Sequence, residues 1–306
     1  MSCPTCGHSE TRPYFVKHTP AGAYAIVRCA QCGLLYLDDR PSAEALAQLY
    51  QSPAYFEADA RGYASDYLQQ RGAIEREAAR RLAVLEGRLG GRGRLLDIGC
   101  AAGFFLAAAR ARGWDVRGVE VAPAMAAYAR ETLHLEVRPS FEAEAYAPGS
   151  LDAVTLWEVI EHLPAPLETL RQATARLRPG GLLALSTPNT GHWQAQRRPE
   201  WWSEFKPPVH VLYFTEATLR DLLARAGFTQ VEIVRTRPLD LSPQGLARLQ
   251  RLRGLLGDGA APRTPLWPVT SLLYRVAGAL AGAWHHARHP GDDSALGLEA
   301  YARRPA

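Results

Sequence analysis

The stretch from Arg94 to Glu120 constrains the fold of this chain more than any other part of it. It begins with a short apolar run that is typical of a buried parallel strand. A turn bracketed by Gly99 and Gly103 follows, and then a helical pattern that ends at Gly113. A second apolar run leads to Glu120 at its carboxyl end. Such a unit holds a nucleoside-bearing ligand over the helix N-terminus, with the ribose hydroxyls donating hydrogen bonds to the acid.

The spacing of the glycines separates this turn from those of dinucleotide-binding proteins, which carry Gly-x-Gly-x-x-Gly. Here the turn reads Asp97-x-Gly99-x-Ala101-x-Gly103, with an acid at its head and no Lys, Ser or Thr for a phosphate. It resembles the cofactor loop of class I S-adenosylmethionine-dependent methyltransferases. Ala101 stands where that family more often has a glycine, and we expect it to narrow the loop without closing it. On the loop alone, the alternative is an ordinary strand-to-helix turn of another α/β protein.

The resemblance implies which residues bind S-adenosylmethionine. In the family, the acid before the first glycine lies near the amino-acid end of the cofactor, and the acid on the second strand holds the ribose. A loop after the third strand, here predicted at 135–137, usually carries an acid that binds the adenine. That acid is absent or displaced here, and an aromatic residue in the loop is expected to stack on the adenine instead. The implied cofactor-binding residues are Asp97, Gly99, Cys100, Ala101, Gly103, Glu120, Phe141 and Trp157.

Further matches to the family follow in the expected order. Residues 149–163 resemble its fourth strand and the loop after it, and residues 178–189 resemble its fifth strand. The resemblance covers about residues 90–235. It implies an α/β fold: a Rossmann-like sheet of seven strands with helices on both faces, whose seventh strand, at 296–303, is antiparallel to its neighbour. The methyltransferase core is predicted at 94–306, with a helical insertion at 239–293 before the last strand.

Two Cys-x-x-Cys-Gly motifs near the N-terminus predict a small zinc ribbon at residues 1–37. Their four cysteines, Cys3, Cys6, Cys29 and Cys32, have the spacing of a closed, tetrahedral structural zinc site. The glycine after each pair relieves the backbone, and the residues between the pairs alternate well enough to form a hairpin. Disulfides are the alternative. We disfavour them because no secretory signal is recognisable, and we therefore expect the chain to reside in the reducing cytoplasm.

Two further segments have open interpretations. Residues 38–93 are predicted to form a helical linker, in which several aromatic residues precede a long helix at about 70–89; they either cover the cofactor as a lid or pack as ordinary core. The insertion contains a basic amphipathic stretch and an apolar one, together spanning 246–284, for which we weigh core packing, a partner and peripheral contact with a membrane. Core packing is favoured. Pro268 and Arg275 interrupt the apolar stretch and argue against a transmembrane span.

Methyl transfer requires alignment of the acceptor and, for a hydroxyl acceptor, removal of its proton. His210, in a long aromatic loop after the fifth strand, is the predicted general base, and His162 is a candidate for the same role from the opposite rim. A structural role for His210 at the start of the next helix is the alternative. Glu158, Glu161, His162 and His210 also resemble the Mg²⁺ or Mn²⁺ site of small-RNA 2′-O-methyltransferases, and the first three resemble the metal motif of ubiquinone-pathway O-methyltransferases. The same motif also occurs as an ordinary strand-exit loop.

Composition narrows the class of function. The chain has 306 residues, of which 47% are hydrophobic and 22% charged, and its net charge of +4 is too mild to indicate nucleic-acid binding by itself. We predict a methyltransferase that moves a methyl group from S-adenosylmethionine to a small-molecule or saccharide acceptor, by O-methylation. The alternative is a protein with a zinc ribbon and an inactive methyltransferase fold that binds nucleic acid or has a regulatory role. The intact loop and its two acids disfavour that alternative.

Overall fold

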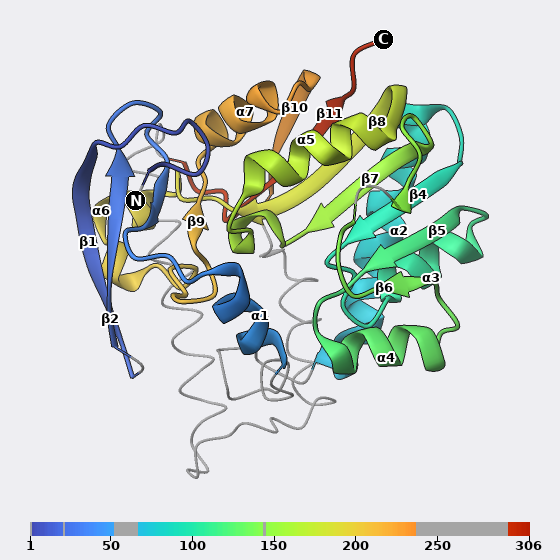
Figure 1. Ribbon diagram of the computed structural model, residues 1–306, viewed down its shortest axis with the longest axis horizontal. Helices are drawn as coiled ribbons and strands as arrows, with labels where there is room; N and C mark the ends of the chain where they lie inside the picture. Colours follow the sequence, from blue (N-terminus) through green and yellow to red (C-terminus); the bar gives the residue numbers. More distant parts are fainter. Residues whose placement is uncertain (1, 21, 52–66, 143–144, 237–292) are drawn as a thin grey trace, which may run out of the picture.

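A computed structural model describes residues 2–20, 22–51, 67–142, 145–236 and 293–306 (Figure 1). Its centre is a seven-stranded sheet in the order β10-β11-β8-β7-β4-β5-β6. Neighbouring strands from β8 to β6 pair in parallel, whereas β11 is antiparallel to both β8 and β10, as predicted for the last strand. The strands are β4 (Arg94–Ile98), β5 (Asp115–Val119), β6 (Val137–Arg138), β7 (Leu151–Trp157), β8 (Leu177–Pro188), β10 (Thr229–Thr236) and β11 (Gly297–Arg303).

Helices cover both faces of this sheet. Successive residues of its central strand point to opposite sides, and both sides of that strand are apolar, so both need to be covered. Leu95 of β4 packs in the core beneath α2 (Arg71–Leu89), α3 (Phe104–Ala111) and α4 (Pro123–Glu131). Leu96 packs in the core beneath α5 (Pro166–Arg176) and α7 (Glu216–Arg225). Both side chains are fully buried. An apolar run without alternation is therefore what a strand covered on both faces needs.

The N-terminal residues form a second sheet that does not stand alone. The predicted hairpin consists of β1 (Thr11–Thr19) and β2 (Gly22–Cys29), and β2 pairs with β3 (Leu35–Leu37). The fourth strand, β9 (Leu212–Tyr213), comes from the chain after β8, and Leu35 pairs with Tyr213. One hydrophobic core runs through this sheet into the face of the central sheet beneath α5 and α7. Figure 1 shows β9 lying between the N-terminal hairpin and the central sheet.

The segments between these strands depart from the predictions in detail. The long helix predicted at about 70–89 is α2, preceded by the single turn η2 (Tyr67–Gln70). The third core strand lies at β6, about two residues later than predicted. The loop predicted from 190 to 215 contains α6 (Trp193–Arg197), η5 (Pro199–Trp201) and β9.

Parts of the predicted lid and insertion lie outside the described residues. Of the linker, α1 (Ala43–Gln51), η2 and α2 are described, whereas residues 52–66 are not. The insertion at 239–293, with the stretch 246–284, falls outside the description apart from its last residue. Among the helices that are described, none combines the length and the apolar character needed to cross a bilayer.

Candidate active site

The turn between β4 and α3 has a backbone that excludes larger side chains. Gly99 and Gly103 have φ values of 76° and 82°. A Cβ at Gly99 would lie 2.4 Å from Cγ2 of Val159, and one at Gly103 would lie 2.5 Å from Cδ1 of Leu135. Ala101 also has a positive φ, of 46°, which costs a residue with a Cβ about 1–2 kcal/mol. The turn therefore keeps a strained, narrow backbone at the N-terminus of α3.

Glu120, directly after β5, is tied to this turn. Its Oε2 accepts a hydrogen bond from the backbone nitrogen of Ala101 at 2.8 Å, and its Oε1 accepts one from that of Ala122 at 2.7 Å. Burial raises the pKa of this carboxyl, while these amides act to lower it. Each carboxylate oxygen can accept a second hydrogen bond. The acid is thus fixed in position and still has capacity for two hydroxyl donors.

Asp97, at the end of β4, is 2% exposed and accepts a hydrogen bond from the Thr155 hydroxyl at 2.6 Å. Burial raises the pKa of Asp97 to about 7, against the effect of this bond and of the Arg81 charge. A buried acid at the head of the turn favours a cationic group beside it.

The other predicted cofactor residues lie in differing surroundings. The Cys100 side chain is buried against Gly118, so that only its backbone belongs to the turn. Phe141 is half-buried, with its ring 6.2 Å from that of Tyr146. Trp157 is half-buried beside the central helices rather than open on the turn: the Arg81 guanidinium lies 4.1 Å from its ring centroid.

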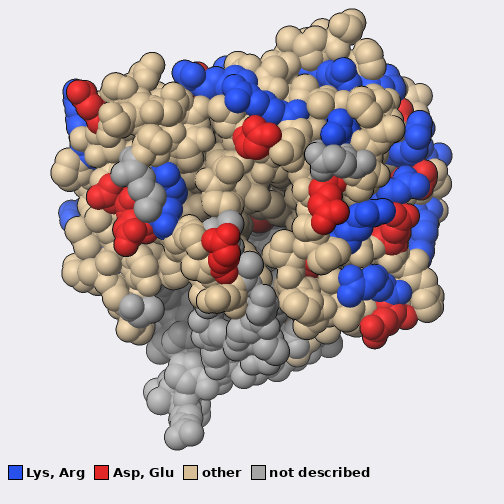
Figure 2. Space-filling model, in the orientation of Figure 1, with Lys and Arg blue, Asp and Glu red and all other residues tan. Residues whose placement is uncertain are grey.

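A cavity of about 960 Å³ lies between α2 and the carboxyl ends of β7 and β8. Figure 2 shows one face of the molecule, with a recess near its middle and basic side chains gathered along its upper and right-hand margins. Most of the residues that line the cavity have polar or charged side chains, although apolar atoms supply much of the wall's surface. The wall includes Glu77, Arg80, Arg81, Glu158, Ser186, Trp202, Glu204 and Glu299.

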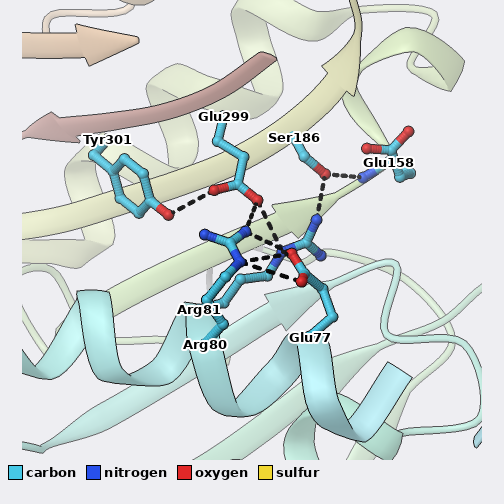
Figure 3. Close-up of polar contacts among 7 residues, drawn as sticks. All are labelled: Glu77, Arg80, Arg81, Glu158, Ser186, Glu299 and Tyr301. Carbon is cyan, nitrogen blue, oxygen red and sulfur yellow. Dashed lines mark hydrogen bonds and ion pairs between the residues drawn. The ribbon is translucent and has the colours of Figure 1, made fainter. Parts of the chain in front are cut away.

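The two arginines in this wall are compensated by neighbouring acids (Figure 3). Glu299 of β11 is 2% exposed and pairs with Arg80, while its Oε1 lies 3.2 Å from Nε of Arg81. The Tyr301 hydroxyl donates to its other oxygen at 3.0 Å. Glu77 pairs with Arg80 at 2.5 Å and with Arg81 at 3.1 Å. The network joins α2 to the central sheet beside the cavity.

Three of the four residues of the predicted Mg²⁺ or Mn²⁺ site come together. Glu161, His162 and His210 each offer a ligand atom, and these atoms lie within 4.8 Å of one another. Glu158 is not part of this cluster; it faces the cavity instead. The residue spacing suggested a set of four. Glu158, however, has a φ of 56°, and this backbone conformation turns its side chain away from those of the η4 turn (Ile160–His162).

Both histidines of the cluster have a fixed tautomer. Nδ1 of His162 lies 2.9 Å from the carbonyl oxygen of Val209 and 3.0 Å from the hydroxyl oxygen of Tyr50, and Nδ1 of His210 lies 2.9 Å from the carbonyl oxygen of Glu204. A carbonyl only accepts, so each Nδ1 carries the proton and each Nε2 carries a lone pair. Burial lowers the pKa of both imidazoles, that of His210 to about 3, so both are neutral. Neutral imidazoles held through Nδ1 are oriented as metal ligands are.

Glu161 completes the cluster with an unpaired oxygen. Its side chain is almost fully buried, and its Oε2 accepts a hydrogen bond from the Thr187 hydroxyl at 3.0 Å. Its Oε1 has no hydrogen-bond partner within the described part of the chain and lies 3.9 Å from Nε2 of His162. Burial, followed by the charge of Glu158, raises its pKa well above the usual value. Ionising a buried carboxyl that has one oxygen without a partner is costly, so this arrangement suits a cation.

The four N-terminal cysteines form a second cluster. Sγ of Cys3 lies 3.6 Å from that of Cys32, and Sγ of Cys6 lies 3.5 Å from that of Cys29. These distances are too long for disulfides, and all four are free thiols. They are close to the separation of about 3.8 Å that zinc–sulfur bonds of about 2.3 Å give in a tetrahedron. The glycine after each pair has a positive φ, as expected for the tight turns that aim two sulfurs at one ion.

Sequence reasoning missed three residues of the cavity wall. Arg81, Ser186 and Glu299 come from α2, β8 and β11, which are far apart in the sequence. One signal was available, since an acid within the apolar strand that contains Glu299 requires a buried cationic partner. Which cation this is depends on the packing of α2 and has no local signature.

Comparisons with known proteins agree with this architecture. A family model described as a methyltransferase domain matches residues 68–233. The ubiquinone biosynthesis O-methyltransferase of Xanthomonas campestris pv. campestris (strain B100) is 38% identical over 103 residues, which are 31% of this chain and 43% of that protein. The match thus spans less than half of that relative's length.

Solved structures share the fold at low identity. An S-adenosylmethionine-dependent methyltransferase from Archaeoglobus fulgidus has a TM-score of 0.52 and 18% identity, covering 78% of this chain and 98% of that one. A geranyl diphosphate C-methyltransferase from Streptomyces coelicolor A3(2) has a TM-score of 0.53 and 20% identity, covering 86% and 100%. The predicted seven-stranded fold is confirmed.

Proposed function

Because this chain belongs to the class I S-adenosylmethionine-dependent methyltransferases, we propose that it transfers the methyl group of S-adenosylmethionine to a hydroxyl of a small molecule. The observation that carries the proposal is the turn after β4, in which Glu120 is fixed by the backbone of Ala101 and retains acceptor capacity for a ribose. The similarity to an O-methyltransferase supports oxygen as the methylated atom. No feature of the described structure favours the nucleic-acid-binding alternative.

The cofactor is proposed to lie across the carboxyl ends of β4 and β5. Glu120 holds the ribose hydroxyls, and the buried carboxyl of Asp97 faces the cationic amino-acid end. The backbone from Gly99 to Gly103 lies beneath the cofactor. Phe141 contacts the adenine, and Val121, which is apolar and 47% exposed beside Glu120, offers it a second surface.

The acceptor is proposed to bind in the cavity beside α2. The polar side chains in the cavity wall favour an acceptor with several hydroxyl groups, such as a saccharide. Carboxylates accept hydrogen bonds from hydroxyl groups, whereas guanidinium groups donate to hydroxyl oxygens. Glu158, Ser186 and Arg81 offer both kinds of partner within one wall. The sulfur separations of the N-terminal cysteines, which fit a metal site rather than disulfides, support a location in a reducing compartment, the cytoplasm.

Two metal sites are part of the proposal. Zn²⁺ at Cys3, Cys6, Cys29 and Cys32 would hold the N-terminal hairpin together, and the sulfur separations fit it. At Glu161, His162 and His210, two imidazoles and one carboxylate fit Mn²⁺ better than Mg²⁺, which prefers oxygen ligands. A divalent ion there would give the buried carboxylate the cationic partner that it lacks among the described residues.

We propose this ligand role for His210 and His162 in place of the general-base role predicted from the sequence, because neither lines the cavity. Replacing His210 with Ala separates the two roles. If His210 is a ligand, its loss should lower the bound manganese found by metal analysis. The activity that remains should then fall with added chelator in proportion to the loss of metal. A variant that keeps full metal content but loses turnover would restore the base.

The proposed function is tested by cofactor binding and by acceptor identification. Calorimetry with S-adenosylhomocysteine should show one site per chain. Incubation of the protein with isotope-labelled S-adenosylmethionine and a cell extract, followed by mass spectrometry, should show a labelled O-methyl product. Absence of S-adenosylhomocysteine binding would overturn the proposal, as would a label found only on nucleic acid.

A further inference from the structure

We propose that Glu158 is the general base of the methyl transfer, the group that takes the proton of the acceptor hydroxyl. This inference rests on the proposed function and goes beyond it by assigning the proton-transfer step to one carboxylate. Four observations support it: the position of Glu158 beside the cofactor turn, its backbone, the pairing of the other acids, and the charges around it.

The first observation is position. Glu158 follows β7 directly, and its neighbour Val159 packs against the cofactor turn so closely that a Cβ at Gly99 would lie 2.4 Å from Val159 Cγ2. The Glu158 side chain is exposed, and it lines the cavity. It therefore lies where the cofactor turn meets the acceptor cavity, which is where methyl transfer must occur.

The second observation is the backbone of Glu158. Its φ of 56° is unusual for a residue with a side chain and is costly. The strained conformation is held by Ser186, whose carbonyl oxygen and Oγ each accept a hydrogen bond from the Glu158 backbone nitrogen at 3.1 Å. In Figure 3 the contact with Ser186 runs to this nitrogen, and the carboxylate points away from the arginines.

The third observation is that the other acids in the cavity wall have cationic partners. Glu299 and Glu77 pair with the two arginines of α2, and Glu204 pairs with Lys206 at 2.9 Å. Within the described ranges, Glu158 takes part in no ion pair. It is thus the acid of this wall whose carboxylate remains available to a substrate.

The fourth observation concerns the charges around the Glu158 carboxyl. Glu158 is solvent-accessible, but its carboxyl lies within the cavity, where partial loss of hydration raises its pKa, and the negative charge of Glu204 raises that pKa further. Three groups act in the opposite direction: the Ser186 hydroxyl on β8, the Arg81 guanidinium on α2 and the Lys206 ammonium on the loop before β9. The pKa of Glu161 is raised by burial and then by the charge of Glu158. A carboxylate whose pKa is raised is a stronger base than one in water.

The step balances with no additional reactant. As the acceptor oxygen attacks the methyl carbon, a carbon–oxygen bond forms and the carbon–sulfur bond breaks. The electron pair of that bond stays on sulfur, which changes from a sulfonium cation to the neutral thioether of S-adenosylhomocysteine. The hydroxyl proton moves to the Glu158 carboxylate, which later releases it to water.

The test compares Glu158→Gln with Glu232→Gln, a matched control at an exposed position of β10, whose carboxylate pairs with Arg88; neither residue of this pair lines the cavity. Methyl transfer is measured with tritiated S-adenosylmethionine and the acceptor identified by mass spectrometry. S-adenosylhomocysteine binding is measured by calorimetry. We expect Glu158→Gln to lower kcat by about 10²–10⁴-fold and to leave the Kd for S-adenosylhomocysteine within about twofold. The control should retain wild-type kcat.

A pH profile distinguishes a base from a structural residue. Wild-type kcat should rise with pH as Glu158 ionises and then level off, whereas kcat of Glu158→Gln should lack that step and increase only as the acceptor hydroxyl itself ionises. Glu158→Asp should restore part of the rate and the step. A Glu158→Gln enzyme with wild-type kcat, or with the wild-type pH step at reduced rate, would overturn the assignment and leave the proposed function intact. A wild-type protein that binds no S-adenosylhomocysteine would overturn both.

Discussion

Replacing Gly99 with Ala should weaken both the fold and cofactor binding, for a reason that the structure makes quantitative. The φ of 76° disfavours any side chain, which costs about 1–2 kcal/mol. The new Cβ would also lie 2.4 Å from Cγ2 of Val159, and forcing a methyl group into a packed site costs about 1–3 kcal/mol. The expected loss in the free energy of unfolding is the sum of these, about 2–5 kcal/mol.

Another glycine separates the two contributions. Gly90, which caps α2, has a φ of 72° but no atom within 4 Å of an added Cβ. Gly90→Ala should therefore lose only the backbone part, about 1–2 kcal/mol. In the double variant Gly99→Ala/Val159→Ala, the two Val159 methyl groups that the new Cβ would strike are absent. The steric part of the loss should therefore disappear, so that the two substitutions together cost about 1–3 kcal/mol less than the sum of their separate costs.

Urea unfolding and calorimetry with S-adenosylhomocysteine are the assays. We expect the cofactor affinity of Gly99→Ala to fall and to recover in part with Val159→Ala, and that of Gly90→Ala to stay unchanged. Equal losses of stability in Gly99→Ala and Gly90→Ala would refute the steric argument. So would a double variant that is no better than the sum of its single changes.

Three further changes test separate parts of the site. Glu120→Ala should weaken S-adenosylhomocysteine binding by about 1–3 kcal/mol, because the ribose loses a charged acceptor; unchanged affinity by calorimetry would remove Glu120 from the site. Cys6→Ser should lower the zinc content found by metal analysis from one per chain and expose the N-terminal hairpin to protease, while protein purified without zinc but with that hairpin resistant would contradict the proposed site. Asp97→Asn should raise the thermal stability of the unliganded protein at pH 8 and change it little at pH 4. The raised pKa of about 7 means that the folded state holds a proton which the unfolded state releases above about pH 4, so stability falls as pH rises toward 7; a gain that is equal at both pH values would show that ionisation is not the cause.

The parts of the fold that could be predicted are those whose signals are local. The β4 to β5 unit follows from an apolar run, a glycine turn and a helical period, which lie within one stretch of sequence. The Cys pairs likewise carry their geometry in their spacing. The strand after α4 is only two residues long, Val137–Arg138, and such a strand has too few residues to show a period, which explains its shifted prediction.

The candidate site was predictable only where residues adjacent in sequence stay adjacent in space. Glu158 and Glu161 look like members of one set because they are only three positions apart in the sequence. One backbone angle at Glu158 sends the first toward the cavity and the second into the core. The pKa of His210 is lowered by burial and by the charge of Lys206, and the residues next to His210 in the sequence do not predict that burial.

The pairing of β3 with β9 determines when the N-terminal segment can finish folding. Its partner strand is synthesised only after most of the central sheet, and contacts between distant parts of a chain form late. Backbone hydrogen bonds then run from Leu37 to Val211 and from Val211 to Glu161, so this late step also sets the position of the buried acid. A chain shortened to residues 68–233 would keep β9 without its partner. Such an open, apolar edge is a site for aggregation, so we expect the shortened chain to be insoluble rather than an independent catalytic unit.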